Sequence, residues 1–248
     1  MVKEGAKNME SKKEKIKKVI PLLKKMHPHA RCELVHNNPL ELLIATILSA
    51  QCTDERVNKV TQDLFKKYKS VKDYAESPLK ELENDIRPTG FFRNKAKMIK
   101  ECSREIVERF KGEVPDNLED LVSLPGIGRK TANLVLGTAF GVPGIIVDTH
   151  VLRVSQRLGF TQNKDAEKVE FDLMEIIPKK EWVNVSYLFM FHGRYICKAR
   201  KPLCENCDLP KFCNSPPSRH PHSLLLNLSP LLVFQVCLYY RQLSSSVR

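Results

Sequence analysis

Four cysteines near the C-terminal end of the chain could together hold one metal centre. Cys197, Cys204, Cys207 and Cys213 follow one another with six, two and five residues between them. A close pair of cysteines is common in zinc ribbons, but such sites usually contain two such pairs and this segment contains one. A [4Fe–4S] cluster also takes four cysteine ligands and tolerates uneven spacing. The spacing therefore favours an iron–sulfur cluster over zinc.

Disulfide bonds are the other possible use of these cysteines. The first nineteen residues, MVKEGAKNMESKKEKIKKV, have no apolar core and contain several acids, so they resemble neither a secretory signal nor a transit peptide. We therefore expect a reducing compartment, in which disulfides are rare. The remaining cysteines are expected to be ordinary buried or half-buried thiols; they are Cys32, Cys52, Cys102 and Cys237.

Residues 116–139 predict two short helices joined by a tight turn. Asp116 and Glu119 are expected to cap the first helix, and Gly126 and Gly128 allow the backbone of the turn to approach another molecule closely. The second helix is expected to begin at Arg129. Free N–H groups at a helix N-terminus suit a phosphate, so the turn predicts phosphate binding.

Lys130 lies in the first turn of this second helix, where the helix dipole disfavours a cation. A residue that is unfavourable at its position in a helix often has a functional role there. A neutral amine at this position could act as a nucleophile. The simpler alternative is that Lys130 contacts a phosphate, and the residues by themselves favour this alternative.

Asp148 directly precedes a predicted helix over 149–158 and is expected to be its N-cap. A carboxylate held in this way could also stand beside a developing cation. His150 is more simply explained as a structural histidine. Gln51 ends a nearly all-apolar helix predicted over 40–51, and is either a plain terminal residue or a side chain aimed at bases.

The rest of the chain predicts an all-α protein. Its 248 residues are 42% apolar and carry a net charge of +12, which favours nucleic acid as the partner and an anionic membrane second. Helical periodicity is present and sustained strand alternation is not. Further helices are expected over 10–26, 54–68, 94–110 and 165–177.

The segment 215–248 differs from the body of the chain. It has no acidic residue, and Pro230 interrupts its apolar run. A membrane-spanning helix needs about 20 mostly apolar residues. We therefore expect an atypical tail that is not part of the fold, and no membrane contact.

Three motifs and the cysteine spacing resemble the endonuclease III family of DNA glycosylases. The motifs are ILSAQCTD, LPGIGRKTAN and VDTHVLRVSQRLG, and the resemblance covers residues 12–214. It implies a helix-hairpin-helix DNA glycosylase fold in which two helical domains flank an active-site cleft. The implied division is an N-terminal helix within 1–31 that packs on the cluster domain, a six-helix domain over 32–142 with the hairpin at 116–139, and a cluster domain over 143–214.

The same resemblance implies a bifunctional enzyme of base excision repair that removes oxidised pyrimidines and cuts the strand by β-elimination. The damaged base is flipped out of the duplex. Lys130 would attack the sugar C1′ to form a Schiff base, and Asp148 would assist. Gln51 would fill the gap left by the base, and Phe91 would be an apolar wedge. The hairpin residues Gly126, Gly128 and Arg129 would contact DNA, and the four cysteines would hold a [4Fe–4S] cluster.

The implied partner is double-stranded DNA with damaged pyrimidines or abasic sites, bound by a monomer. The compartment would be the bacterial cytoplasm and nucleoid, or the nucleus or mitochondrion of a eukaryote. An adenine-mismatch glycosylase shares the hairpin and cluster but usually has Ser in place of Lys130 and a large C-terminal domain. A pyrimidine-dimer or mismatch-specific relative is a further alternative. Outside the enzymes, a DNA-binding module with structural zinc is the alternative, although phosphate binding does not require Lys130 together with Asp148.

Overall fold

The protein is helical throughout the part that the structure describes. This computed structural model describes residues 2–215, with side chains from Met9 onward, and it contains no β-strand in that range. The all-α prediction is confirmed. The predictions for the tail concern residues that lie, apart from Ser215, outside the described range. No helix within residues 2–215 combines the length and the apolar character needed to cross a membrane.

The α-helices are α1 (Val2–Met26), α2 (Pro39–Leu48), α3 (Asp54–Lys67), α4 (Val71–Glu76), α5 (Leu79–Asp85), α6 (Phe92–Phe110), α7 (Leu118–Ser123), α8 (Arg129–Val135), α9 (Thr149–Arg157), α10 (Ala166–Ile176) and α11 (Trp182–Phe191). Short 3-10 turns occur at Arg87–Thr89, Lys179–Glu181, Cys204–Asn206 and Pro210–Phe212. Two π-helical turns, Leu136–Phe140 and His192–Ile196, extend α8 and α11.

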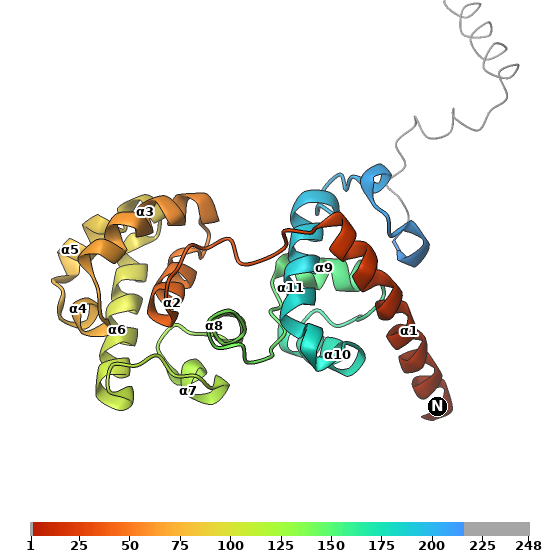
Figure 1. The fold of residues 1–248 in the computed structure, drawn as a ribbon, viewed down its shortest axis with the longest axis horizontal. Coiled ribbons are helices and arrows are strands. Elements are labelled where there is room, and N and C mark those ends of the chain that lie inside the picture. The colour runs from red at the N-terminus through yellow and green to blue at the C-terminus, as the bar shows by residue number, and fades with distance from the viewer. Residues whose placement is uncertain (1, 216–248) are drawn as a thin grey trace, which may run out of the picture.

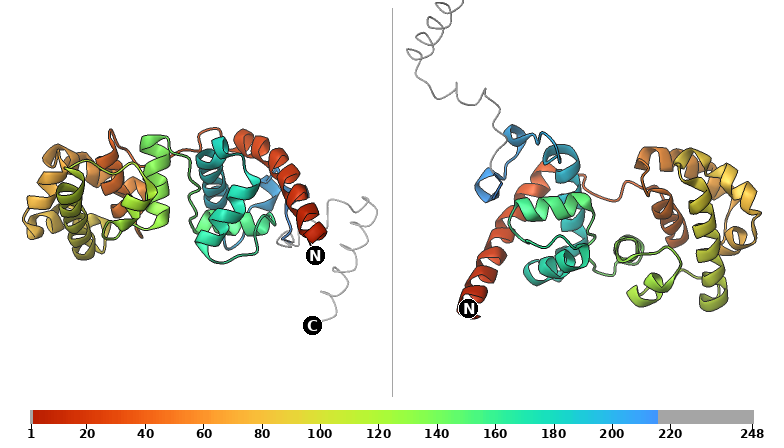
Figure 2. Two further views of the ribbon diagram at one scale, coloured as in Figure 1. Left: turned by 90° about the horizontal axis from the view of Figure 1, so that it is seen from below. Right: turned by 180° about the vertical axis from the view of Figure 1, so that it is seen from behind.

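These helices form two lobes (Figure 1). One lobe contains α2 to α7, and the other contains α1, α9, α10 and α11, with the cysteine segment at its edge. Helix α8 lies between the lobes, and the chain crosses between them at residues 27–38 and 141–148. The two further views in Figure 2 show the same separation. Residues at the two crossings are therefore placed beside both lobes.

Helix α2 forms the centre of the first lobe. Its residues from Leu42 to Leu48 are all buried, because an almost fully apolar helix can only be accommodated with neighbours on every side. The predicted buried helix is confirmed, but its predicted end at Gln51 is wrong. The helix ends at Leu48, and residues 49–52 form a turn in which Gln51 has φ 54°.

Residues 32–142 form seven α-helices, one more than the six expected. The extra helix arises because Ser77-Pro78 separates α4 from α5. Proline cannot supply a helical N–H and disfavours the α conformation of the residue before it. Ser77 has ψ 144° and Pro78 has ψ 127°, so the chain is extended between the two short helices.

Helix α1 packs on the second lobe. Ile16, Val19 and Leu23 are fully buried on one face of this helix, and the Lys24 ammonium lies 3.0 Å from a Glu181 carboxylate oxygen. The helix begins at Val2, which is earlier than the start at Glu10 that its sequence suggested.

An ion-pair network joins the two lobes. Arg194, in the π-helical turn after α11, pairs with Asp54 at the start of α3 at 3.0 Å, and also with Glu33 in the first crossing segment. All three side chains are partly shielded from solvent, which reduces the screening of this contact. The network therefore ties the crossing segment and the loop after α2 to the cysteine-bearing lobe.

Candidate active site and metal centre

The hairpin between α7 and α8 begins one residue later than the sequence suggested. Asn117, not Asp116, is the N-cap of α7, and its side-chain oxygen accepts a hydrogen bond from the Asp120 N–H at 2.9 Å. The predicted cap by Asp116 and Glu119 is therefore wrong. Asn and Asp are about equally good N-caps, so adjacent Asp and Asn residues could not be ranked from type alone.

The turn itself requires glycine at Gly126. This residue has φ 77°, and a Cβ there would lie 2.3 Å from the Met98 side chain. Gly128 is the N-cap of α8 and has no side chain to cover the helix end, and a Cβ at this position would have no neighbour within 4 Å. The first N–H groups of α8 have no partners within the helix, so they are left for a ligand.

Lys130 is the second residue of α8 and is exposed. It forms no ion pair or side-chain hydrogen bond with the described residues. Lys130 and Asp148 likewise make no direct bond to one another. An exposed amine without a competing partner can reach a bound molecule.

The neighbouring Arg129 is placed differently. Its guanidinium donates to both carboxylate oxygens of Glu170, at 2.9 and 3.0 Å, and lies over the Phe171 ring. Glu170 is buried, with 3% of its surface exposed. The Arg129 side chain therefore bonds within the protein, and its main-chain N–H lies in the first turn of α8. Glu170 is too distant in sequence for the pair to be recognised without the structure.

Asn133 connects α8 to the segment that carries Asp148. This buried side chain donates to the Ile145 carbonyl at 3.1 Å and to Glu170 at 3.0 Å. Gly144 is required at the same contact, since a Cβ there would lie 2.7 Å from the Asn133 side-chain oxygen. The helix bearing Lys130 and the crossing segment leading to Asp148 are thus held together by one amide.

Asp148 is the N-cap of α9, as predicted. Its Oδ1 accepts hydrogen bonds from the N–H groups of His150 and Val151 at 2.8 and 2.7 Å. Oδ2 takes no hydrogen bond from the described residues, and the side chain is half-buried. The cap thus fixes the carboxylate and leaves one oxygen available to the site.

The His150 side chain has a hydrogen-bonding partner within the fold. Its Nδ1 lies 3.1 Å from the Arg153 guanidinium, which can only donate, so this ring nitrogen is an acceptor. Arg153 also donates to the carbonyls of Gly193 and Cys197 at 2.8 and 3.0 Å. His150 therefore helps to orient an arginine that supports the cysteine segment.

Gln51 and Phe91 both lie in surface turns of the first lobe. Each has a left-handed backbone, with φ 54° and 49°, and the Phe91 side chain is 64% exposed. Non-glycine residues seldom adopt this conformation, which is more common at functional sites than elsewhere. An exposed phenylalanine on such a turn has no contact within the fold that explains it.

The four cysteines of the C-terminal segment line one cavity of 80 Å³. None of them forms a disulfide. Much of the remaining wall is apolar, with contributions from Val154, Leu158, Ile196 and Leu209. The structure therefore brings together all the cysteines that the spacing grouped.

Several donors point at these sulfur atoms. The Arg157 guanidinium lies 3.2 Å from the Cys197 sulfur, and the Leu209 N–H lies 3.4 Å from the Cys207 sulfur. His192 Nε2 lies 3.6 Å from the same Cys207 sulfur, and its Nδ1 is 3.1 Å from His27. Burial and the nearby His27 lower the pKa of His192 to about 4, so this ring is neutral at pH 7. Donors of this kind stabilise thiolates bound to metal.

The sulfur environment suits a positively charged group. Burial raises the pKa of the Cys207 thiol, and the neighbouring Cys197, Cys213 and Cys204 raise it further. A metal centre would remove this mutual repulsion. No three His, Cys, Asp or Glu side chains in residues 9–215 are arranged to hold a single metal ion. The four cysteines line a shared cavity, and four thiolates are a known ligand set both for an iron–sulfur cluster and for zinc.

Sequence reasoning did not identify Arg153, Arg157, Asn133 or Glu170 as parts of the site. Arg153 and Arg157 are four residues apart on α9, and this spacing places them on one face of the helix. This spacing is the one feature of the sequence that could have suggested that the two arginines act on the same partner. Nothing local distinguishes Glu170 from the other acids of α10.

Comparison with known proteins identifies the family. The model of the HhH-GPD superfamily of base excision DNA repair proteins matches residues 44–179. Endonuclease III of Synechocystis sp. is 52% identical over 208 residues, which are 84% of this chain and 95% of that protein. Endonuclease III of Bacillus subtilis is 52% identical over 201 residues, 81% of this chain and 92% of the relative.

Solved structures agree with these sequence matches. A trapped endonuclease III–DNA covalent intermediate is 52% identical and superposes with a TM-score of 0.78, covering 82% of this chain and 95% of that chain. A thermostable thymine-DNA glycosylase is 28% identical with a TM-score of 0.73, covering 81% and 96%. The chain therefore belongs to the endonuclease III family within the HhH-GPD superfamily of base excision DNA repair proteins.

Proposed function

We propose that this chain, a base excision repair DNA glycosylase and AP lyase, removes oxidised pyrimidines from duplex DNA with Lys130 as its nucleophile. The observation that carries the proposal is the placement of Lys130. It is an exposed lysine directly after the glycine turn, on a helix that Asn133 ties to the segment ending in Asp148. The trapped covalent DNA intermediate of the similar endonuclease III supports a covalent route.

In the first step, Lys130 Nζ attacks C1′ of the damaged nucleotide. The C1′–N bond to the base breaks, and the base leaves with the bonding electron pair and takes up a proton. The nitrogen then loses a proton, and the C1′–O4′ bond breaks with O4′ taking the bonding pair and a proton, which gives a Schiff base between Lys130 Nζ and C1′. Removal of a C2′ proton then breaks the C3′–O bond and cuts the strand 3′ to the lesion. Water hydrolyses the Schiff base and releases the enzyme.

Asp148 would stabilise the positive charge that develops on the sugar as the base leaves. Its Oδ1 is held by two N–H groups, and its Oδ2 is available to the site. A fixed charge needs no reorganisation during the reaction, which is why such groups are effective in catalysis.

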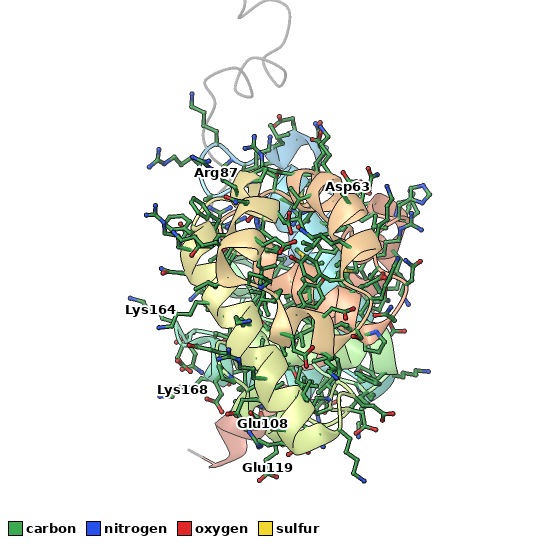
Figure 3. The ribbon with its side chains drawn as sticks, turned by 90° about the vertical axis from the view of Figure 1, so that its left-hand side faces the viewer. Asp63, Arg87, Glu108, Glu119, Lys164 and Lys168 are labelled. Carbon is green, nitrogen blue, oxygen red and sulfur yellow. The ribbon has the colours of Figure 1, made fainter. Side chains whose placement is uncertain are left out.

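DNA would be bound by the hairpin and by both lobes. The N–H groups at the start of α8, next to Gly126 and Gly128, would bind a phosphate. Figure 3 labels Arg87, which belongs to the first lobe, and Lys164 and Lys168, which belong to the second. Cations spread over both lobes suit a duplex that crosses between them. Gln51 would fill the gap left by the extruded base, and Phe91 would enter the stack as a wedge.

The four cysteines would hold a [4Fe–4S] cluster, whose role would be structural. When bound, the cluster would supply the cross-links that order a segment with few apolar residues of its own. This segment contains Lys198, Arg200 and Lys201, which would then face DNA phosphates. We expect one copy of the chain to be sufficient, since every residue assigned to the reaction lies on the same chain.

A panel of duplexes, each with one defined lesion, tests the substrate class. We expect excision and strand cleavage at thymine glycol and other oxidised pyrimidines. Duplexes with adenine opposite 8-oxoguanine, thymine opposite guanine, or a pyrimidine dimer serve as comparisons. Preference for any of these three over oxidised pyrimidines would overturn the substrate assignment. About four iron atoms per chain in the purified protein would support the cluster over zinc.

A further inference from the structure

Lys95 is a buried lysine that bonds to two separate turns of the first lobe. Only 4% of its surface is exposed. Its ammonium donates to the Leu48 carbonyl at 2.8 Å and to the Thr89 carbonyl at 2.9 Å. One nitrogen atom thus brings two carbonyl groups side by side, although they are 41 residues apart in the chain.

Both carbonyls belong to the last residue of a helical segment. Leu48 ends α2 and Thr89 ends the 3-10 turn Arg87–Thr89. Carbonyls at helix ends lack intrahelical partners and carry the negative end of the helix dipole, so an ammonium is a suitable cap for both. The chain then continues to Gln51 from the first end and to Phe91 from the second. Both residues have a left-handed backbone and are exposed, as is Lys111 just after the other end of α6.

The burial of this charge requires an explanation. Lys95 forms no ion pair with a described carboxylate, and its burial lowers the pKa of its ammonium. A buried cation without a carboxylate partner is unfavourable compared with an apolar side chain of similar size. Methionine would fill nearly the same space, but it could not hold two carbonyls together.

We propose that Lys95 is a positioning residue that fixes the Gln51 turn and the Phe91 turn relative to one another, so that both side chains enter the base stack as one unit. This inference rests on the proposed function, in which these two side chains replace and separate bases. Lys95 itself is buried and would not touch DNA. Its effect would fall on base extrusion and not on the chemistry at the sugar.

The chain offers a matched control in the same helix. Lys100, five residues further along α6, also uses its ammonium to cap carbonyls, those of Ala75 in the last turn of α4 and of Ser77 just after that helix. Burial lowers the pKa of this group as well. Neither of its partners leads to Gln51 or Phe91. Lys95→Met and Lys100→Met therefore remove the same kind of bond, and only the first releases the two turns.

The experiment compares single-turnover excision of thymine glycol from a paired site with excision from a site opposite a one-nucleotide gap, where no partner base holds the lesion. 2-Aminopurine next to the lesion reports unstacking directly. For Lys95→Met we expect about tenfold or greater loss at the paired site and a smaller unstacking signal, with little loss at the gapped site. Lys100→Met should lower thermal stability without this difference between substrates.

Equal losses of Lys95→Met on both substrates, or the same pattern for Lys100→Met, would overturn the inference. In a Gln51→Ala background, Lys95→Met should cost less than in the wild type, because residues that act together are not additive. Should Lys95→Met not fold, Lys95→Gln, which keeps an N–H donor group on a shorter, uncharged side chain, is tested in the same way. Failure of the wild-type protein to excise thymine glycol from either substrate would count against the proposed function itself.

Discussion

Asp148 and Arg157 lie at opposite ends of one short helix, α9, and each bonds to a different part of the site. Asp148 caps the first turn, and Arg157 is the last helical residue and lies 3.2 Å from the Cys197 sulfur. Arg157 also donates to the carbonyls of Lys198 and Ala199 at 2.8 and 3.1 Å. The proposed catalytic carboxylate and the cysteine segment are therefore supported by the same element.

Replacing Arg157 with Lys should weaken the hold on the cluster without removing the positive charge. The guanidinium presents several N–H groups in one plane and reaches a sulfur and several carbonyls at once, and a lysine ammonium cannot reproduce this arrangement. We expect faster loss of iron and of visible absorption under mild chelation. Arg109→Lys is the control, because Arg109 also makes two side-chain contacts, to Glu105 and Ser123, but on the exposed surface of the other lobe. Equal iron loss from both variants would show that this arrangement at Arg157 is unimportant.

Asp148 combines a structural and a chemical role that two substitutions can separate. Asn caps helices about as well as Asp, so Asp148→Asn should keep its stability while base removal slows by about 10²-fold or more. Asp148→Ala should lose the same activity and also about 1 kcal/mol of stability. Single-turnover kinetics and urea unfolding measure the two effects. An Asn variant with wild-type excision would remove Asp148 from the reaction.

Glu170 should be important for stability because it is buried and serves both Arg129 and Asn133. Glu170→Ala leaves two donors without their acceptor, and we expect a loss of about 2–4 kcal/mol in the free energy of unfolding. Glu167→Ala is a close control, since Glu167 also pairs with Arg129, at 3.6 Å, but is 55% exposed. Exposed pairs contribute about 0–1 kcal/mol. Similar unfolding midpoints for the two variants would contradict the importance assigned to burial.

DNA binding should depend strongly on salt. The chain carries a net charge of +12, and the proposed interface contacts several phosphates. Affinity for a lesion duplex should fall about a hundredfold or more between about 50 and 200 mM salt. Fluorescence anisotropy over this range gives the slope. A flat response would argue that phosphate contacts contribute little.

The features predicted correctly from the sequence are those set by local interactions. The cap at Asp148 bonds to N–H groups two and three residues later, and the glycine turn lies within a few residues of Lys130. The grouping of the cysteines also depends on a short segment. The apolar stretch after Leu40 identified a buried helix, but not its end, because Ser49 and Ala50 are compatible with either helix or turn.

The features that sequence could not supply depend on residues far apart in the chain. Arg129 was expected to face DNA, and the structure pairs its guanidinium with Glu170 on α10. Lys95 resembles any other lysine of α6 until α2 and the Arg87–Thr89 turn are placed against it. Such pairs form when separate helices and turns pack together, and they cannot be predicted from the periodicity of one helix.

The most direct measurement is covalent trapping at Lys130. Borohydride reduces an imine but not an ion pair, so wild-type protein mixed with thymine-glycol DNA and borohydride should become joined to the DNA. Lys130→Gln keeps similar size and polarity but has no basic amine. We expect this variant to bind the duplex with nearly wild-type affinity and to form no covalent product and no strand break. Trapping of Lys130→Gln as efficient as that of the wild type would contradict the assignment, and Lys130 would then be only a phosphate contact.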